Sequence, residues 1–355
     1  MWAAVRDGIE AGLCWVGQNG YAIVVDLLLT ALIAYPLGNF LLFGWVRKEY
    51  EVRTSLSEAA KRTYLETFHR IVVTDAEAAT RFDQLYRRWY GRRHFALPIA
   101  FVLLIALIEN FVVGRAVIPL VGSGKLDIAS AAIAGAYTFV TWDLFARMQR
   151  RNMSPADICR GALRLAIAIP VGYAFALLMS ESLGPFIAFA IGVFPVGVLG
   201  EVLRQIANKR LGLEIGAATA DDQISRLSGV DMPIAARIED ADITTIPQLA
   251  WCDPIQLSMR SNLAFGYVVD IVSQALAWVY LGDRIKNLRT MGLRGAFEIK
   301  VFLRDLNGGD QHPRELAQNA LPVAAQLGDC PEAGLLLAFD QIANDPNTNF
   351  LYEAA

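Results

Sequence analysis

Ionisable residues within otherwise apolar segments are the part of this sequence best placed to do chemistry. A charge inside a bilayer costs about 2.5–3.5 kcal/mol on insertion scales, so such residues pair with one another or serve a function. Two uses stay open for them: interhelical ion pairs, for instance Asp143 with Arg164, or a proton or ion pathway through Asp26 and Glu109. The predicted intramembrane polar layer consists of Asp26, Glu109, Arg115, Asp143, Arg164 and Glu201.

Familiar catalytic and metal-binding motifs do not occur in the sequence. The histidines His69, His94 and His312 belong to no ligand motif, and HExxH, GxSxG and GxxxxGK[ST] are absent. The four cysteines are isolated and form no CxxC pair. We therefore expect no catalytic residues, no metal and no cofactor, and a protein that is not an enzyme.

The composition indicates a membrane protein. Of 355 residues, 55% are apolar and 19% are charged, and the mean hydropathy is +0.37. Soluble globular proteins carry about 45–50% apolar and about 25% charged residues. These values exclude a disordered chain and an ordinary soluble enzyme of two domains.

Five apolar segments precede residue 203, and each is long enough to cross about 30 Å of hydrocarbon as an α-helix. Small residues at fourfold spacing in the last three segments predict close helix packing, because helices in lipid associate through tight contacts. The expected fold is all-α: a five-span transmembrane helical bundle at 20–202, followed by a soluble helical domain at 203–355. The predicted spans are 20–46, 95–113, 128–147, 161–180 and 184–202.

Basic residues set the predicted orientation. The loop at 47–94 contains eleven Lys and Arg residues, and cytoplasmic loops retain positive charge. This places the loop inside, the N-terminus outside and the C-terminus in the cytoplasm, in a cell inner (plasma) membrane. The loop itself is expected to form two helices, the second of them capped at Thr74. Residues 1–19 are predicted to be an interfacial segment and not a cleaved signal peptide.

The region after residue 203 is soluble in character and acidic, with 13 Lys and Arg residues against 19 Asp and Glu. Within it, 263–281 is apolar but contains Asp270 and Gln274 near its centre. Two interpretations remain open for this segment, the central core helix of the domain or a sixth span.

A tight hairpin is predicted at 228–231, between two short helices, with a further helix opening at Thr244 or Thr245. This order, over 224–252, resembles the helix-hairpin-helix domains of the SAM-like superfamily. In nucleic-acid-binding members the resemblance implies a Gly-h-Gly hairpin whose amides bind a phosphate. Here Gly229 and Val230 are kept, but Asp231 replaces the second glycine, so a protein-binding or structural hairpin is favoured.

A second hairpin is predicted at 291–296, where Gly292 and Arg294 lie in a basic stretch. It is the better candidate for an anionic partner. The acidic charge of the whole C-terminal region nevertheless argues against nucleic acid as a partner.

Together these features predict a non-enzymatic scaffold or adaptor in the membrane. Its partners would be the lipid bilayer and a protein, or a second copy of the chain bound through 203–355. The alternative is a channel or transporter subunit with a polar layer at Asp26 and Glu109.

Overall fold

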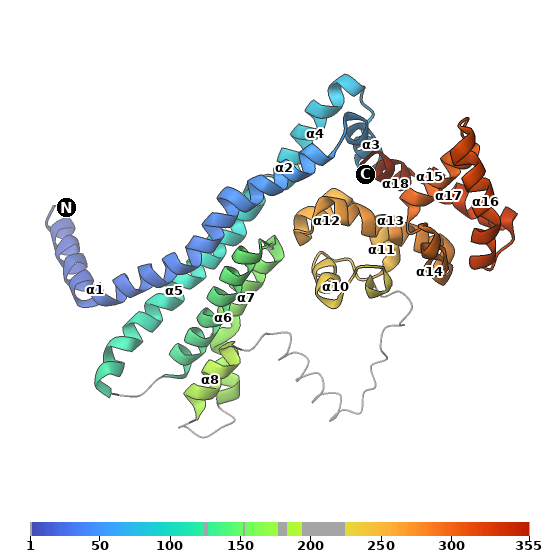
Figure 1. Cartoon of the computed structure of the whole chain (residues 1–355). Coiled ribbons are helices and arrows are strands. Elements are labelled where there is room, and N and C mark those ends of the chain that lie inside the picture. Colours follow the sequence, from blue (N-terminus) through green and yellow to red (C-terminus); the bar gives the residue numbers. More distant parts are fainter. Residues whose placement is uncertain (1, 124–126, 152, 177–182, 194–223, 355) are drawn as a thin grey trace. The chain divides into compact units, whose positions relative to one another are not determined.

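The computed structural model is helical throughout the residues it describes, and no strand occurs among them (Figure 1). The described residues are 2–123, 127–151, 153–176, 183–193 and 224–354. Contacts divide the chain into two compact units. The first unit consists of residues 1–45 and 92–216, and the second unit of residues 46–91 and 217–355.

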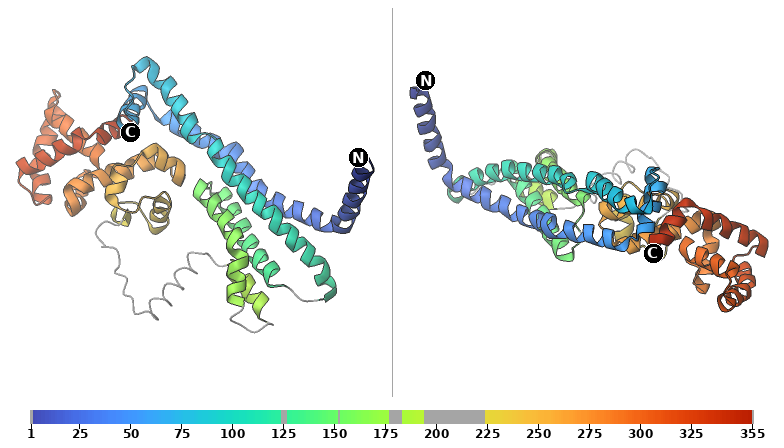
Figure 2. Two further views of the ribbon diagram at one scale, coloured as in Figure 1. Left: turned by 180° about the vertical axis from the view of Figure 1, so that it is seen from behind. Right: turned by 90° about the horizontal axis from the view of Figure 1, so that it is seen from above.

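In the first unit, the long helices α1 and α5 run side by side, as both views in Figure 2 show. Helix α6 packs against α7 and α8. A π-helix at Phe40–Gly44 follows α1 four residues after Pro36, whose missing N–H interrupts the helical hydrogen bonding. The helices are α1 (Trp2–Asn39), α5 (Arg93–Ser123), α6 (Ile128–Arg150), α7 (Pro155–Ala176) and α8 (Gly184–Val193).

Four helices in the described residues are long and apolar enough to cross a membrane: Gly20–Ser55, Asp75–Val113, Ile128–Arg150 and Phe265–Met291. The first three contain the predicted spans 20–46, 95–113 and 128–147. Helix α7 covers the predicted span 161–180 as far as Ala176, and α8 covers 184–202 as far as Val193. The remaining residues of those two segments lie outside the described ranges.

Glycines allow α6 and α8 to touch through their backbones. A Cβ atom on Gly192 would lie 2.6 Å from the carbonyl oxygen of Ala132, and one on Gly135 would lie 2.2 Å from that of Phe189. No side chain fits at these separations, so the helices can approach only because both positions are glycine. The small residues predicted to permit close packing do so here.

The second unit joins the loop helices to the C-terminal helices. Its loop helices are α2 (Trp45–Ser55), α3 (Glu58–His69) and α4 (Asp75–Tyr90). Its C-terminal helices are α10 (Met232–Glu239), α11 (Ile246–Ala250), α12 (Pro254–Ser261), α13 (Phe265–Leu281), α14 (Ile285–Leu288), α15 (Ala296–Asn307), α16 (Gln311–Leu327), α17 (Glu332–Asn344) and α18 (Pro346–Ala354).

Helix α13 is the centre of the second unit. It packs against α11, α12, α15, α17 and α18. Its apolar residues are buried on most of its circumference, among them Phe265, Ile271 and Leu276. Protein side chains therefore cover most of the apolar surface that made the segment 263–281 a possible sixth span.

Candidate functional sites

A chain of polar side chains links α1 to α5 inside the first unit. The Thr30 hydroxyl donates to Asp26 Oδ1 over 3.2 Å, and Asn110 Nδ2 donates to Thr30 Oγ1 over 3.3 Å. Asp26 and Asn110 are both buried. The hydrogen-bonded chain gives the acid of α1 a partner on its own helix and, through that partner, a connection to α5.

Glu109 precedes Asn110 on α5, but one oxygen of its carboxyl group forms no hydrogen bond. The side chain is buried, at 6% exposure, and its Oε2 atom has no hydrogen-bond partner. The sequence placed Asp26 and Glu109 in one layer. The structure shows a hydrogen bond from Thr30 for Asp26, whereas Glu109 Oε2 remains unsatisfied.

The charges at the other end of the first unit form a separate group. Asp143 accepts from Arg147 Nε over 2.8 Å, and Arg147 Nη1 also binds Asp157 over 2.8 Å, joining α6 to α7. The expected partner of Asp143 was Arg164. Arg164 Nη2 instead donates to the carbonyl oxygen of Gly192 over 2.5 Å, although the charge of Asp143 still acts on it.

The Arg164 guanidinium also lies over the ring of Phe139, 3.9 Å from its centroid. This buried arginine therefore ties α7 to both α6 and α8. The other two predicted members of the polar layer, the Arg115 side chain and Glu201, lie outside the described residues.

In the second unit, the first predicted hairpin forms a tight turn before α10. Gly229 adopts a φ of +81°, a conformation that favours glycine, and Val230 is buried. Asp231 is the N-cap of α10 and accepts from the Ile234 amide over 2.9 Å. The carboxylate that replaces the second glycine thus has a structural partner within the chain.

Gln274 of α13 holds this hairpin by its backbone. Its Oε1 accepts from the Ser228 amide over 3.0 Å, and its Nε2 donates to the Ser228 carbonyl over 3.2 Å. The Tyr267 hydroxyl donates to the Gly229 carbonyl over 2.9 Å. Side chains of α13 therefore occupy the Ser228 amide and the carbonyls of Ser228 and Gly229.

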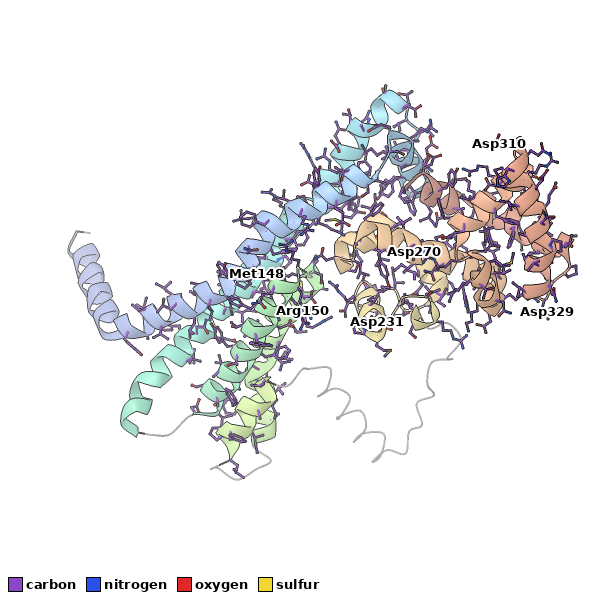
Figure 3. The ribbon with its side chains drawn as sticks, in the orientation of Figure 1. Met148, Arg150, Asp231, Asp270, Asp310 and Asp329 are labelled. Carbon is purple, nitrogen blue, oxygen red and sulfur yellow. The ribbon has the colours of Figure 1, made fainter. Side chains whose placement is uncertain are left out.

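The second hairpin docks on the same helix. Gly292 has a φ of +84°, and Arg294 is paired with Asp270 of α13 and, over 3.8 Å, with Glu298. Asp270 in turn accepts from Gln274 Nε2 over 2.9 Å. Figure 3 shows Asp270 on α13 and Asp231 at the start of α10. The two hairpins, which the sequence left unrelated, are joined through Asp270 and Gln274.

A buried cluster around Asp253 joins the loop to the C-terminal helices, and the sequence gave no indication of it. Asp253 caps α12 and accepts from the amides of Ile255 and Gln256 over 2.8 and 3.1 Å. Its Oδ2 atom accepts from the hydroxyls of Tyr64 and Tyr90 over 2.7 and 3.0 Å. Burial raises the pKa of Asp253, while these hydrogen bonds oppose the increase.

Further contacts extend the same interface along α2. Glu51 accepts from the amide of Phe265 over 2.7 Å, and Lys48 donates to the carbonyl of Leu263. Lys48 and Glu51 also form an ion pair over 3.2 Å. Only the Asp-Pro pair that starts α12 could have been found from sequence, as a capping signal.

Within the described residues, no group of three or more His, Cys, Asp or Glu side chains is arranged to hold a metal ion. Comparisons with protein-family models, with curated proteins and with solved structures found no match to this chain, so its function is argued from its own geometry.

Proposed function

We propose that this chain is an integral protein of the inner membrane that acts as a non-enzymatic scaffold or adaptor. In this proposal five helices cross the bilayer, and the second unit is a soluble body on the cytoplasmic side. The second unit would bind a protein partner or a second copy of the chain.

The observation that carries the proposal is that two distant segments of the chain form the second unit. Residues 46–91 fold with residues 217–355 around Asp253, with Phe350 of α18 packed on Tyr64 and Phe68. A helical body built into the loop between two apolar helices is held to the membrane by more than one chain connection. Such an arrangement suits a protein that presents a binding surface at a fixed place on the membrane.

The hairpins support a protein partner over nucleic acid. In phosphate-binding hairpins, free amides and basic side chains face the phosphate. Here Gln274 binds the Ser228 backbone, Asp231 caps α10, and Arg294 is neutralised by Asp270. We therefore propose that the helix-hairpin-helix-like region is a structural and protein-binding element.

Helices α16 and α17 carry three large apolar side chains that are exposed. Leu316 and Val323, two turns apart on α16, are 58% and 48% exposed, and Leu337 of α17 is 61% exposed. Large exposed apolar side chains close together are typical of protein interaction surfaces. We propose this face as the contact surface of the adaptor.

A photo-crosslinking amino acid placed at Leu316 or Val323 of the full chain, in cells, tests the proposal. We expect a crosslinked species of defined mass, either a dimer or a single stoichiometric partner. Gln318, exposed on the other side of α16, is the matched control and should give none. Absence of a crosslink from both apolar positions, or salt-sensitive co-purification of nucleic acid, would contradict the adaptor proposal.

The second candidate function is a channel or transporter subunit. The polar layer at Asp26 and Glu109 favours it, because Asp26 of α1 and Asn110 of α5 are buried and are connected by hydrogen bonds through the half-buried Thr30. Ion flux into liposomes that contain the purified chain, abolished by Asp26→Asn, would support this function. Flux equal to that of empty liposomes would exclude it.

A further inference from the structure

Glu109 is a buried carboxyl group that the adaptor proposal does not use. It lies sixteen residues into α5, about 24 Å along the axis from Arg93 at about 1.5 Å per residue. The fourteen residues before it, 95–108, contain no charged side chain. Its position is therefore inside the apolar part of a helix long enough to cross a membrane.

The surroundings of Glu109 do not balance a negative charge. Glu109 is only 6% exposed, and its Oε2 atom has no hydrogen-bond partner. A carboxylate left unpaired in an apolar medium takes up a proton instead of remaining charged.

Three other described acids of the first unit, Asp26, Asp143 and Asp157, differ in this respect. Asp143 and Asp157 are both ion-paired with Arg147, which stabilises their charged forms. Asp26 accepts a hydrogen bond from Thr30. Among these acids, Glu109 combines deep burial with an unsatisfied carboxyl oxygen.

We propose that Glu109 is a proton-binding site within the membrane, with its carboxyl group held in the neutral form by its apolar and unpaired surroundings. A metal cation fits this site less well than a proton, because Na⁺ or Ca²⁺ needs several oxygen ligands and Oε2 has no hydrogen-bond partner. The inference does not depend on whether the chain is an adaptor or a channel.

Dicyclohexylcarbodiimide tests the proposal on the full chain in lipid vesicles. This apolar reagent adds a protonated carboxylic acid across one C=N bond, and rearrangement leaves a stable N-acylurea on the side chain. Peptide mass spectrometry locates the adduct. We expect labelling of Glu109 that decreases at least tenfold as the pH is raised, and no labelling of the ion-paired Asp143.

Two variants and one salt series complete the test. Glu109→Gln should remain folded and lose the label, because the amide has nearly the same shape and carries no acidic proton. Asp143→Asn should leave the label on Glu109 unchanged. Absence of the Glu109 adduct, or labelling that does not respond to pH, would overturn the proposal. Protection by Na⁺ at constant pH would replace it by a cation site.

Discussion

The Tyr64 hydroxyl donates a hydrogen bond to Asp253 over 2.7 Å and so joins two residues 189 positions apart in the chain. Tyr64 is fully buried, and burial together with the charge of Asp253 raises its pKa well above the ordinary value. The raised pKa favours the neutral tyrosine, which can donate this hydrogen bond. This contact fixes α3 of the loop to the start of α12.

Tyr64→Phe should destabilise the second unit. The substitution removes one of the two hydroxyls at Asp253 Oδ2 and leaves a buried acceptor partly unsatisfied, which costs about 1–3 kcal/mol. Denaturant unfolding of the purified full chain measures the loss. Tyr280→Phe is the matched control: its hydroxyl bonds Asp345 at a partly exposed position, and its removal should cost less. Equal losses would show that the Tyr64 contact has no special weight.

The raised pKa of Asp253 predicts a pH-dependent stability. Because the folded-state pKa lies above the unfolded value of about 3.9, the folded state binds the proton more tightly. The contribution is complete below pH 3.9 and is lost as the pH rises through the folded-state pKa. Asp253→Asn keeps an N-cap and cannot titrate. The free energy of unfolding, measured at several pH values from acid to neutral, should therefore change less with pH in the variant than in the parent. An unchanged pH dependence would contradict the assignment.

Close contact between α6 and α8 predicts opposite effects for two glycine substitutions. Gly192→Leu must separate the helices, since even a Cβ atom would lie 2.6 Å from Ala132 O, and overpacking costs about 1–3 kcal/mol. Gly38→Ala should raise the free energy of unfolding by about 0.4–1 kcal/mol, because a Cβ atom at this position of α1 would meet no other atom within 4 Å. Thermal unfolding in detergent gives both values. A Gly192 variant as stable as the parent would show that α8 is not packed on α6.

Loss of the Gln274 side chain should release the first hairpin. Gln274→Leu removes the partners of the Ser228 amide and carbonyl together. Hydrogen exchange of residues 226–232 should then accelerate at least tenfold, while exchange in α16 stays the same. Gln318→Leu, an exposed substitution, is the control and should leave the hairpin unaffected. Unchanged hairpin exchange in the Gln274 variant would contradict the proposed anchoring role.

Local features of this fold could be predicted because short-range chemistry determines them. Thr245 caps α11 and accepts from Gln248, and Gly229 adopts its positive φ in the expected hairpin. Thr74 occupies the N-cap position of α4 as expected, but its side chain makes no capping hydrogen bond. Each depends on neighbours within four residues. The length and apolar composition of single segments likewise identified the long apolar helices.

Long-range partners could not be predicted from such patterns. Asp253 and Tyr64 each have an ordinary local role, as an N-cap and as an apolar position of α3, and no spacing relates them. Helical periodicity indicates which face of a helix is buried but not which helix covers it. The expected pair of Asp143 and Arg164 illustrates the same limit, because the neighbouring Arg147 one turn away on α6 binds Asp143.

The two-segment construction of the second unit has a topological consequence. Residues 46–91 and 217–355 share one buried interface, so both must lie in the same compartment. The chain between them can then cross the bilayer only an even number of times, whichever helices make the crossings. The four predicted spans between the two segments satisfy this parity, and the fifth predicted span, 20–46, precedes both segments. If the basic loop is cytoplasmic, as its charge predicts, the acidic C-terminal helices are cytoplasmic too, although their own charge does not indicate it.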